Sequence, residues 1–218
     1  MVAATADQGS PKVRELRDGD VPQVGAMLAR AFAKDPTTEW LFPSPRGRER
    51  RLERWYRLNV MALQDAGEGW VTDDLSAAAL WLPMGVPRRG GRPHLWRQLG
   101  LNLRIGLALR SRLLAALWVN LEVHRRHPRE PTWYLAALGT EPDLQGRGLG
   151  TAVLQPVLRR CDAERLPATL DTVTAEDVAF YQRRDFEIVD EVRRPGAPHF
   201  RIMRRPPADG ADPDSERR

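Results

Sequence analysis

The glycine-rich run from Gln145 to Thr151, Gln-Gly-Arg-Gly-Leu-Gly-Thr, is the feature that most limits how this chain can fold. It lies between a predicted strand over 132–140 and an apolar, helically periodic segment that predicts a helix to about Arg165. Glycine lets a backbone approach a ligand closely, and the free N–H groups of a helix's first turn bind anions. We therefore expect a strand, an anion-binding turn and a helix, an order that suits a pyrophosphate.

The glycine spacing excludes two common nucleotide-binding motifs. A dinucleotide-binding fold would need G-x-G-x-x-G, and a nucleoside triphosphatase would need Lys-Ser or Lys-Thr after its last glycine. Neither is present in the run. Taken alone, the run is equally compatible with a plain strand-to-helix turn, so its flanks must decide.

Composition indicates a single domain, with room for an inserted helical segment, in a chain of 218 residues. The net charge is +5, but Lys12 and Lys34 are the only lysines and the arginines are spread along the chain. No basic stripe interleaved with aromatics occurs, so we expect no nucleic-acid partner and a modest attraction for anionic ligands. The lone Cys161 excludes an internal disulfide and is compatible with a reducing compartment.

The sequence predicts a soluble, cytoplasmic protein without a membrane partner. Its amino terminus lacks an apolar core of signal-peptide length. The most hydrophobic stretch, 99–119, is interrupted by Arg104, Arg110 and Arg112, which are costly in a lipid-spanning helix. A membrane-surface helix is the alternative, but the leucine spacing equally suits a helix that covers a sheet or lines a cleft.

We expect disordered tails at 1–11 and 206–218 around one ordered domain at 12–205, with helical material at 93–127 on the substrate side. The first half predicts a strand at 13–17, a helix capped by Asp20 with Pro22 in its first turn, and a helix over 46–64. Two short strands, 69–72 and 77–82, predict a hairpin.

The second half alternates strands and helices. After the glycine turn and its helix come predicted strands at 168–173, 186–192 and 199–203, with a helix at 175–183 between the first two. This order favours an α/β sheet with parallel neighbours and a ligand at the carboxyl ends of the strands.

Three segments in the right order resemble the GNAT acyltransferase family. Leu144 to Gly150 is similar to its Q-x-x-G-x-G acetyl-CoA loop, 131–142 to the strand before that loop, and 177–186 to its later Asn- and Tyr-bearing element, which ends in Y-x-x-x-G-F. Within the family the chain looks most like actinobacterial enzymes of the puromycin N-acetyltransferase type. The resemblance implies a GNAT fold: a mixed central sheet flanked by helices, with splayed parallel strands forming the acetyl-CoA cleft.

The resemblance also implies how acetyl-CoA, the expected co-substrate, is held. Main-chain groups of the strand would contact the pantetheine arm and thioester carbonyl, where unpaired N–H groups would stabilise a developing oxyanion. An ordinary buried strand is the alternative. The implied cofactor-binding residues are Leu138, Gly139, Thr140, Gln145, Gly146, Arg147, Gly148, Leu149, Gly150, Thr151 and Asp177.

Three residues are candidates for acid–base chemistry. The resemblance implies that Tyr181 protonates the departing thiolate, although it could simply pack beside Phe180. For the base, which must take a proton from the amine, Asp171 is the first choice and Glu141 the second. Either carboxylate could instead be a solvated strand-end group or a helix-cap partner.

Two positions depart from the family pattern, and the remaining reactive side chains have simpler interpretations. Asp177 replaces the usual Asn and would bring a negative charge toward the cofactor unless it turns away or caps the helix; Asp185 replaces a Gly, but tolerates the left-handed conformation. Cys161 follows the apolar face of its helix and is predicted to be a core residue. The histidines lack metal-ligand spacing, so no metal is expected.

The predicted function is that of an N-acetyltransferase which moves an acetyl group from acetyl-CoA to a primary amine of a small molecule, conceivably an antibiotic, by direct attack in a ternary complex. The acceptor would lie against the loop at 83–93, the helical segment after it and the helix near Trp55. A protein or peptide amine as acceptor and a non-catalytic acyl-CoA sensor are the alternatives. We expect a monomer or homodimer.

Overall fold

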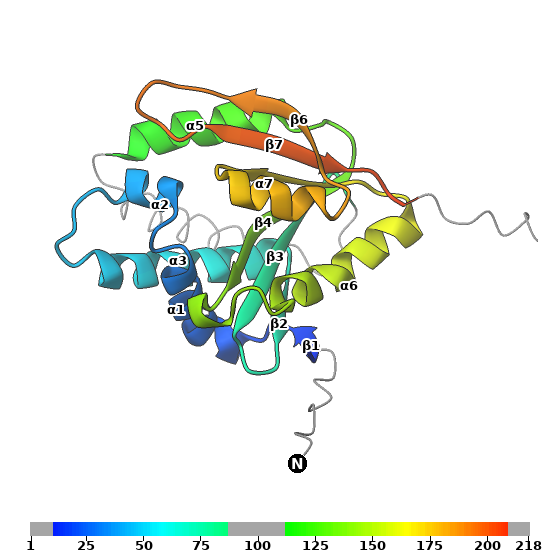
Figure 1. Cartoon of the computed structure of the whole chain (residues 1–218), viewed down its shortest axis with the longest axis horizontal. Coiled ribbons are helices and arrows are strands. Elements are labelled where there is room, and N and C mark those ends of the chain that lie inside the picture. The colour runs from blue at the N-terminus through cyan, green and yellow to red at the C-terminus, as the bar shows by residue number, and fades with distance from the viewer. Residues whose placement is uncertain (1–10, 87–111, 209–218) are drawn as a thin grey trace, which may run out of the picture.

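The computed structural model describes residues 11–86 and 112–208. Its centre is a seven-stranded sheet in the order β1-β2-β3-β4-β5-β7-β6, in which β4 and β5 are the parallel pair and all other neighbours are antiparallel (Figure 1). The strands are β1 (Val13–Glu15), β2 (Glu68–Thr72), β3 (Ala77–Met84), β4 (Thr132–Thr140), β5 (Ala168–Thr172), β6 (Glu187–Val192) and β7 (Phe200–Arg205). The helices are η1 (Asp18–Asp20), α1 (Val21–Ala31), α2 (Pro36–Leu41), α3 (Arg48–Ala66), α5 (Leu113–Arg126), η3 (Pro142–Leu144), α6 (Leu149–Glu164) and α7 (Ala175–Gln182).

Helices α1 and α3 cover one face of the first half of the sheet. Val24 and Leu28 of α1 and Val60 of α3 are fully or almost fully buried in a cluster that includes Leu80 of β3. The two helices meet closely because Gly25 has no side chain: a Cβ placed there would lie 2.8 Å from the Cα of Arg57. The amphipathic pattern of both segments is therefore satisfied by one shared core.

Helix α6 covers the opposite face. Its buried side, which includes Val153, Val157 and Cys161, packs in one cluster with Trp133 and Leu135 of β4. Cys161 is fully buried, and burial raises the pKa of its thiol to about 12. The prediction that Cys161 is a core residue is confirmed, since a thiol in this state is unreactive.

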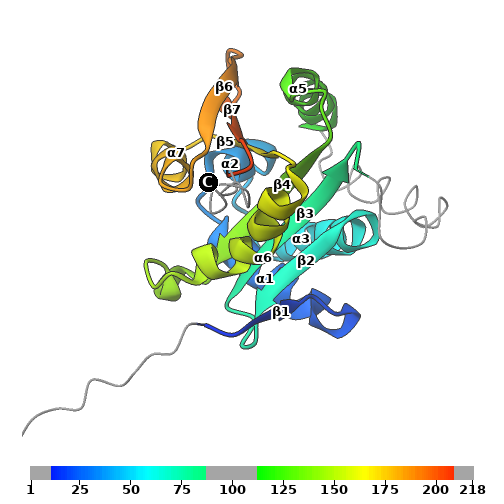
Figure 2. The ribbon, with the colours of Figure 1, turned by 90° about the vertical axis from the view of Figure 1, so that its right-hand side faces the viewer.

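The far end of the sheet has its own layers. Figure 2 shows α7 and α5 on opposite sides of β6 and β7. Val119 and Val123 of α5 pack with Phe200 and Ile202 of β7. On the other side, Tyr181 of α7 belongs to the same cluster as α6.

Strands β4 and β5 separate partway along their length. Their ladder pairs Trp133 with Ala168, Tyr134 with Thr169 and Leu135 with Leu170, after which β4 continues to Thr140 without β5 as a partner. On the other edge of β4, Leu80 faces Ala137 and Trp81 faces Leu135, which leaves Ala136 as an extra bulged residue. Because a bulge bends its strand and increases the local twist, the irregularity at Ala136 explains why the strands part there.

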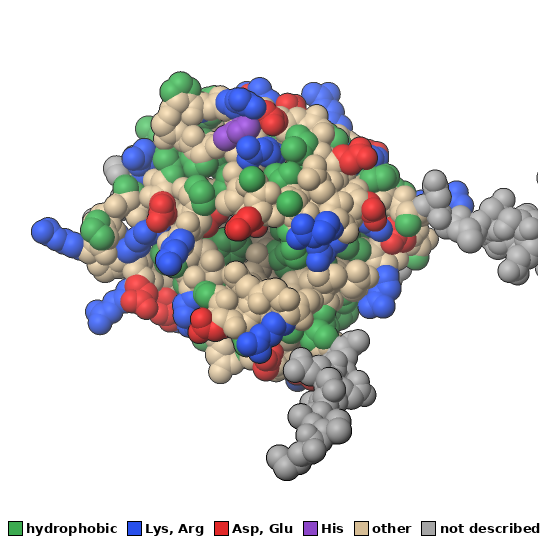
Figure 3. All heavy atoms as spheres, in the orientation of Figure 1, with side chains coloured by type: hydrophobic (Ala, Val, Ile, Leu, Met, Phe, Trp, Pro, Cys, Tyr) green, Lys and Arg blue, Asp and Glu red, His purple; other side chains and the backbone are tan. Residues whose placement is uncertain are grey.

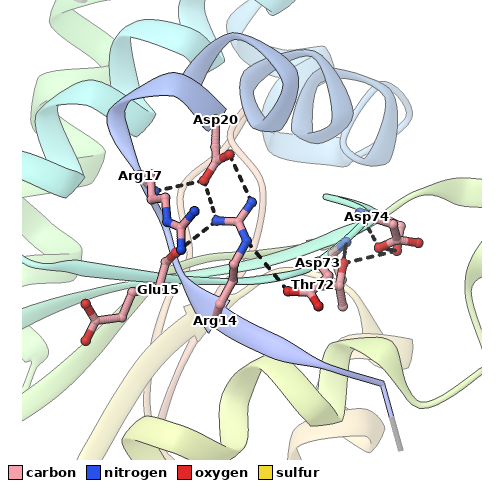
Figure 4. Close-up of polar contacts among 9 residues, drawn as sticks. Arg14, Glu15, Arg17, Asp20, Thr72, Asp73 and Asp74 are labelled. Carbon is pink, nitrogen blue, oxygen red and sulfur yellow. Dashed lines mark hydrogen bonds and ion pairs between the residues drawn. The ribbon is translucent and has the colours of Figure 1, made fainter. Parts of the chain in front are cut away.

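Most predicted elements are present, and two details were wrong. The hairpin, the 132–140 strand and the helices after the glycine turn and over 175–183 are confirmed to within a few residues. Helix α2 was missed. Asp20 is the N-cap residue of α1, as predicted, but makes no side-chain bond to the helix; its carboxylate instead binds the Arg14 guanidinium at 2.6 and 3.0 Å and the Arg17 N–H at 2.9 Å (Figure 4). The predicted tails lie mostly, and the helical material before Arg112 wholly, outside the described residues.

Two predictions about partners, one on membranes and one on nucleic acids, concern the helices and the surface of the molecule. Within 11–86 and 112–208, no helix has the length and apolarity needed to cross a membrane. On the face drawn in Figure 3, basic and acidic side chains are interspersed rather than gathered into a field of one sign.

Candidate active site

The glycine turn presents open backbone at the start of α6. Gly146 and Gly148 have φ of +75° and +81°, a conformation that strongly favours glycine, and neither has an atom within 4 Å of where a Cβ would lie. Gly148 is the N-cap of α6 and makes no side-chain capping bond. The first N–H groups of a 16-residue helix therefore face an exposed turn, which is the geometry that binds a phosphate.

The bulge at Ala136 determines which side chains of β4 face this turn. Before it, Trp133 and Leu135 point to the α6 side; after it, Leu138 joins the α6 cluster while Ala137 joins the α1 cluster. Thr140 also lies near α6, since its Oγ1 is 3.5 Å from an ideal Cβ on Gly150. A regular strand would have put these residues on the opposite faces.

Gly139 is required by packing against α1. A Cβ there would lie 2.5 Å from the Leu28 Cδ2 and 3.4 Å from the Phe32 ring. Phe32 stacks on Tyr56 with ring centroids 5.4 Å apart, and Tyr56 meets Trp55 edge to face at 4.8 Å. An aromatic group from α1 and α3 therefore borders the part of β4 that β5 leaves unpaired.

Two further residues connect the strand to the turn. Gln145 Nε2 donates to the Thr140 carbonyl at 3.4 Å. Glu141 accepts two bonds from the Arg30 guanidinium, at 2.7 and 2.9 Å, and its N–H donates to the Ser76 carbonyl at 2.8 Å. Glu141, the second candidate base, is thus held in an ion pair with α1.

Asp177 and Asp185 both adopt arrangements that the sequence allowed. The Asp177 carboxylate accepts from the hydroxyls of Thr172 at 3.1 Å and of Thr174, the N-cap of α7, at 2.6 Å. Asp185 takes φ of +65°, which preserves the turn usually made by glycine. The departure at Asp185 therefore leaves the turn intact, and the contact of Asp177 with the cofactor remains a prediction.

Arg184 belongs to this region, although sequence reasoning did not single it out. Its guanidinium lies over the Phe180 ring, 3.5 Å from the centroid, and donates to the Phe180 carbonyl and to Thr151 Oγ1 at the start of α6. Its Nε has no hydrogen-bond partner, and burial together with Arg183 lowers its pKa. A cavity of about 350 Å³ next to it is lined by Thr151, Gln155, Leu158, Asp162, Arg183, Arg184, Asp185 and Arg205.

Tyr181, the candidate acid, is buried between two aromatic rings. It meets Phe180 and Phe186 edge to face, at 5.2 and 5.7 Å between centroids. Burial raises its pKa, and the charges of Asp177 and Asp171 raise it further. The phenol therefore keeps its proton well beyond neutral pH.

Asp171, the first candidate base, stands at the fork of the two strands. It follows Leu170, the last β5 residue that pairs with β4, and alternation turns it away from the α6 cluster. There its Oδ1 accepts from Tyr134 Oη at 2.6 Å and lies 3.5 Å from His127 Nε2. Tyr181, the candidate acid, therefore lies on the face of the sheet that α7 covers, and Asp171, the candidate base, points to the opposite face.

Comparison with known proteins agrees with this geometry. A model of the acetyltransferase (GNAT) family matches residues 101–186, the segment that carries β4, the glycine turn, α6 and α7. The match includes Tyr181 and Asp171 as well as the glycine turn.

Solved structures extend the similarity to the whole chain. A histone acetyltransferase HPA2 and related acetyltransferase from Corynebacterium glutamicum is 20% identical, with a TM-score of 0.65 over 93% of this chain and 99% of that one. The ribosomal-protein-S18-alanine N-acetyltransferase of Escherichia coli is 14% identical, with a TM-score of 0.54 over 94% and 98%. A polyamine N-acetyltransferase from Drosophila melanogaster is 17% identical, with a TM-score of 0.52 over 90% and 100%.

The chain has the GNAT fold, as the sequence predicted. The segment at 101–186 is similar to the acetyltransferase (GNAT) family, and the solved structures share the fold of the chain. Enzymes of this superfamily use acetyl-CoA as co-substrate and act on amines. Within the described ranges, no group of three or more His, Cys, Asp or Glu side chains is arranged to hold a metal ion.

Proposed function

We propose that this protein transfers the acetyl group of acetyl-CoA to a primary amine of a small molecule, by direct attack within a ternary complex. The observation that carries the proposal is the fork at Leu135 and Leu170, beyond which the β4 backbone continues without its parallel partner. A thioester arm that enters such a fork can hydrogen-bond to main-chain atoms alone. The proposed main-chain contacts are those of Leu138, Gly139 and Thr140.

The phosphates of the coenzyme would bind at the glycine turn. The uncapped start of α6 supplies N–H donors and the positive end of the helix dipole, and the exposed Arg147 adds a full positive charge. Arg184 and Arg183, which line the cavity beside Thr151 together with Asp162 and Asp185, are suited to the nucleotide end. The proposed contacts in the turn are Gln145, Gly146, Arg147, Gly148, Leu149, Gly150 and Thr151.

Tyr181 and Asp171 would act from opposite sides of the fork. As the amine nitrogen bonds to the thioester carbon, the C–S bond breaks and the sulfur takes a proton from Tyr181. The nitrogen loses its proton to Asp171, which is partly exposed and can receive it directly. Glu141 is the less favoured base because Arg30 already binds both of its carboxylate oxygens.

The acceptor would lie on the α1 and α3 side of the fork. Phe32, Trp55 and Tyr56 supply an apolar border next to Gly139. Asp35, whose pKa is raised by burial and by the charge of Asp177, stands three residues beyond Phe32. An aromatic wall with a nearby carboxylate favours a small amine with an apolar body, including antibiotics of the puromycin kind.

Calorimetry with acetyl-CoA followed by thiol-release assays tests the proposal. The amine panel should contain puromycin, a polyamine and a peptide with a free amino terminus. We expect binding of acetyl-CoA and turnover with a small amine. Turnover with the peptide alone would overturn the small-molecule assignment, and binding without turnover on any amine would instead favour an acyl-CoA sensor.

The Tyr181→Phe variant tests the acid. It should bind acetyl-CoA as the unmodified protein does and lose about 10²-fold in kcat, the usual contribution of a positioned proton donor. Thermal unfolding is the control, because Tyr181 also packs in the core. Full turnover by a stably folded variant would remove Tyr181 from the mechanism.

A further inference from the structure

His127 is a buried polar side chain whose surroundings are unusual. Its side chain is 3% exposed, and neither ring nitrogen has a hydrogen-bond partner. Buried polar groups are almost always paired, because an unpaired one costs about 1–3 kcal/mol. What distinguishes this imidazole is its neighbour, the carboxylate of the candidate base Asp171, 3.5 Å from Nε2.

The chain fixes His127 in place through its local sequence. His127 is the C-cap of α5, and the following Pro128 disfavours the helical conformation at the residue before it. It accordingly adopts an extended backbone, with φ of −64° and ψ of 143°. The imidazole lies edge to face with the Tyr134 ring, 5.0 Å between centroids.

This placement puts His127 behind the candidate base. Asp171 Oδ1 is 2.6 Å from Tyr134 Oη and 3.5 Å from His127 Nε2. The side chain of Asp171 is 17% exposed and that of His127 is 3% exposed, so an acceptor amine can reach the carboxylate but not the ring. Hydrogen bonds of catalytic groups are often long without substrate and shorten when it binds.

The described arginines next to His127 in sequence or on the neighbouring strand have carboxylate partners of their own. Arg126, its neighbour on α5, already binds Glu122 and lies 3.7 Å from Asp190 of β6. On β7, Arg204 binds Glu130 at 2.6 Å. Among the described residues, Asp171 from β5 and Tyr134 from β4 are the titratable side chains with a recorded contact to the imidazole.

We propose that His127 is a positioning residue for the acetyl-transfer reaction: it orients the Asp171 carboxylate together with Tyr134, so that Asp171 can take the proton of the amine. This inference rests on the proposed function. The proton balance closes: the amine nitrogen gives a proton to Asp171, the sulfur takes one from Tyr181, and Tyr181 regains its proton from Asp171 once the product has left. When the acceptor starts as an ammonium ion, its first proton goes to water.

Kinetics of His127→Ala and His127→Gln test the role. We expect His127→Ala to lower kcat by about tenfold to a hundredfold, with the acetyl-CoA dissociation constant within about twofold and with an altered acidic limb of the kcat/KM profile. His127→Gln should recover part of kcat, since its amide N–H can still donate to Asp171. His124 is an exposed histidine one turn earlier on α5, so His124→Ala is the matched control. It should change neither kcat nor the acidic limb of the kcat/KM profile.

A purely structural role would give a different result. In that case His127→Ala would lower stability and acetyl-CoA binding, His127→Gln would recover nothing, and the shape of the pH profile would not move. That outcome overturns the proposal. Unchanged kcat in a folded His127→Ala variant overturns it equally.

A measurement on the protein without substrates separates this inference from the proposed function. Imidazole resonances of His127 can be assigned by their absence from His127→Gln. We expect them to shift in Asp171→Asn and in Tyr134→Phe, while those of His124 stay in place. If no amine is acetylated, the proposed function fails. If the His127 resonances do not shift in Asp171→Asn, the proposed interaction between His127 and Asp171 is wrong.

Discussion

Thr174 and Asp177 are joined by two hydrogen bonds at the start of helix α7: the Asp177 N–H donates to Thr174 Oγ1 at 3.0 Å, and the Thr174 hydroxyl donates to the Asp177 carboxylate at 2.6 Å. Thr174 is the N-cap, and the Asp177 carboxylate binds its hydroxyl rather than the backbone N–H that a capping box would use. This arrangement uses the carboxylate within the helix and leaves its negative charge close to Tyr181 and Asp35, whose pKa values it raises.

The Asp177→Asn variant should therefore bind acetyl-CoA more tightly, by a fewfold, because it removes a negative charge near an anionic ligand while the amide oxygen still accepts from Thr174. Calorimetry at two salt concentrations checks this, since screening should shrink the gain. Weaker binding by a folded Asp177→Asn variant would show that the carboxylate itself contacts the coenzyme.

Gly148→Ala should weaken acetyl-CoA binding by at least tenfold and destabilise the fold by about 1 kcal/mol, since φ of +81° disfavours any side chain. Calorimetry and thermal unfolding measure the two effects. Gly19→Ala is the control, because a Cβ there also meets nothing within 4 Å and Gly19 belongs to η1 rather than to the glycine turn. Equal losses of binding in both variants would contradict a role for the turn.

Asp185→Val should destabilise the protein by about 1–2 kcal/mol, because a β-branched residue tolerates φ of +65° poorly. Asp185→Gly should be neutral or stabilising in the same chemical-denaturation experiment. Glu187→Val, at an exposed strand position two residues later, is the control for a general effect of valine. Unchanged stability of Asp185→Val would mean that the backbone at residue 185 can leave the left-handed conformation without cost.

Asp20→Asn should flatten the dependence of stability on acid pH. The hydrogen bond from Arg14 and the Arg17 N–H hold the pKa of Asp20 below its usual value. A carboxylate with a lowered folded-state pKa stabilises the fold above its unfolded pKa of about 3.9, and this contribution is lost as pH falls below it. Urea unfolding between about pH 5 and 2 should show a smaller loss in Asp20→Asn than in the unmodified chain. The same flattening in Arg14→Gln would identify the pair as its source; an unchanged slope in Asp20→Asn would exclude it.

Local signals explain what the sequence could predict. The limits of the 132–140 strand and the start of α6 after Gly148 were recovered because glycine and apolar periodicity act over short spans. Helix α2 was missed because its six residues are held by distant partners: Thr38 by the Tyr56 hydroxyl at 3.0 Å and Trp40 by the Gly196 carbonyl at 2.6 Å.

The candidate site likewise contains some residues with a local sequence signal and others that only the folded chain brings together. Tyr181 and Asp171 were proposed from the resemblance to the family and stay predictions, and the buried setting of Tyr181 fits a residue held in one orientation. His127 and Tyr134 carried no local signal, since their relation to Asp171 exists only once α5, β4 and β5 are packed together. Arg184 could have been noticed as a basic residue beside the motif tyrosine, but its bond to Thr151 depends on the fold.

The extra residue at Ala136 has a consequence for the speed of ligand capture. Since the strands are already apart before any ligand arrives, the coenzyme would not have to break a ladder to enter. Preorganisation of this kind spares the free energy of opening and lets encounter, rather than rearrangement, limit association. The single extra residue at Ala136 would then keep β4 and β5 apart whether or not the coenzyme is bound.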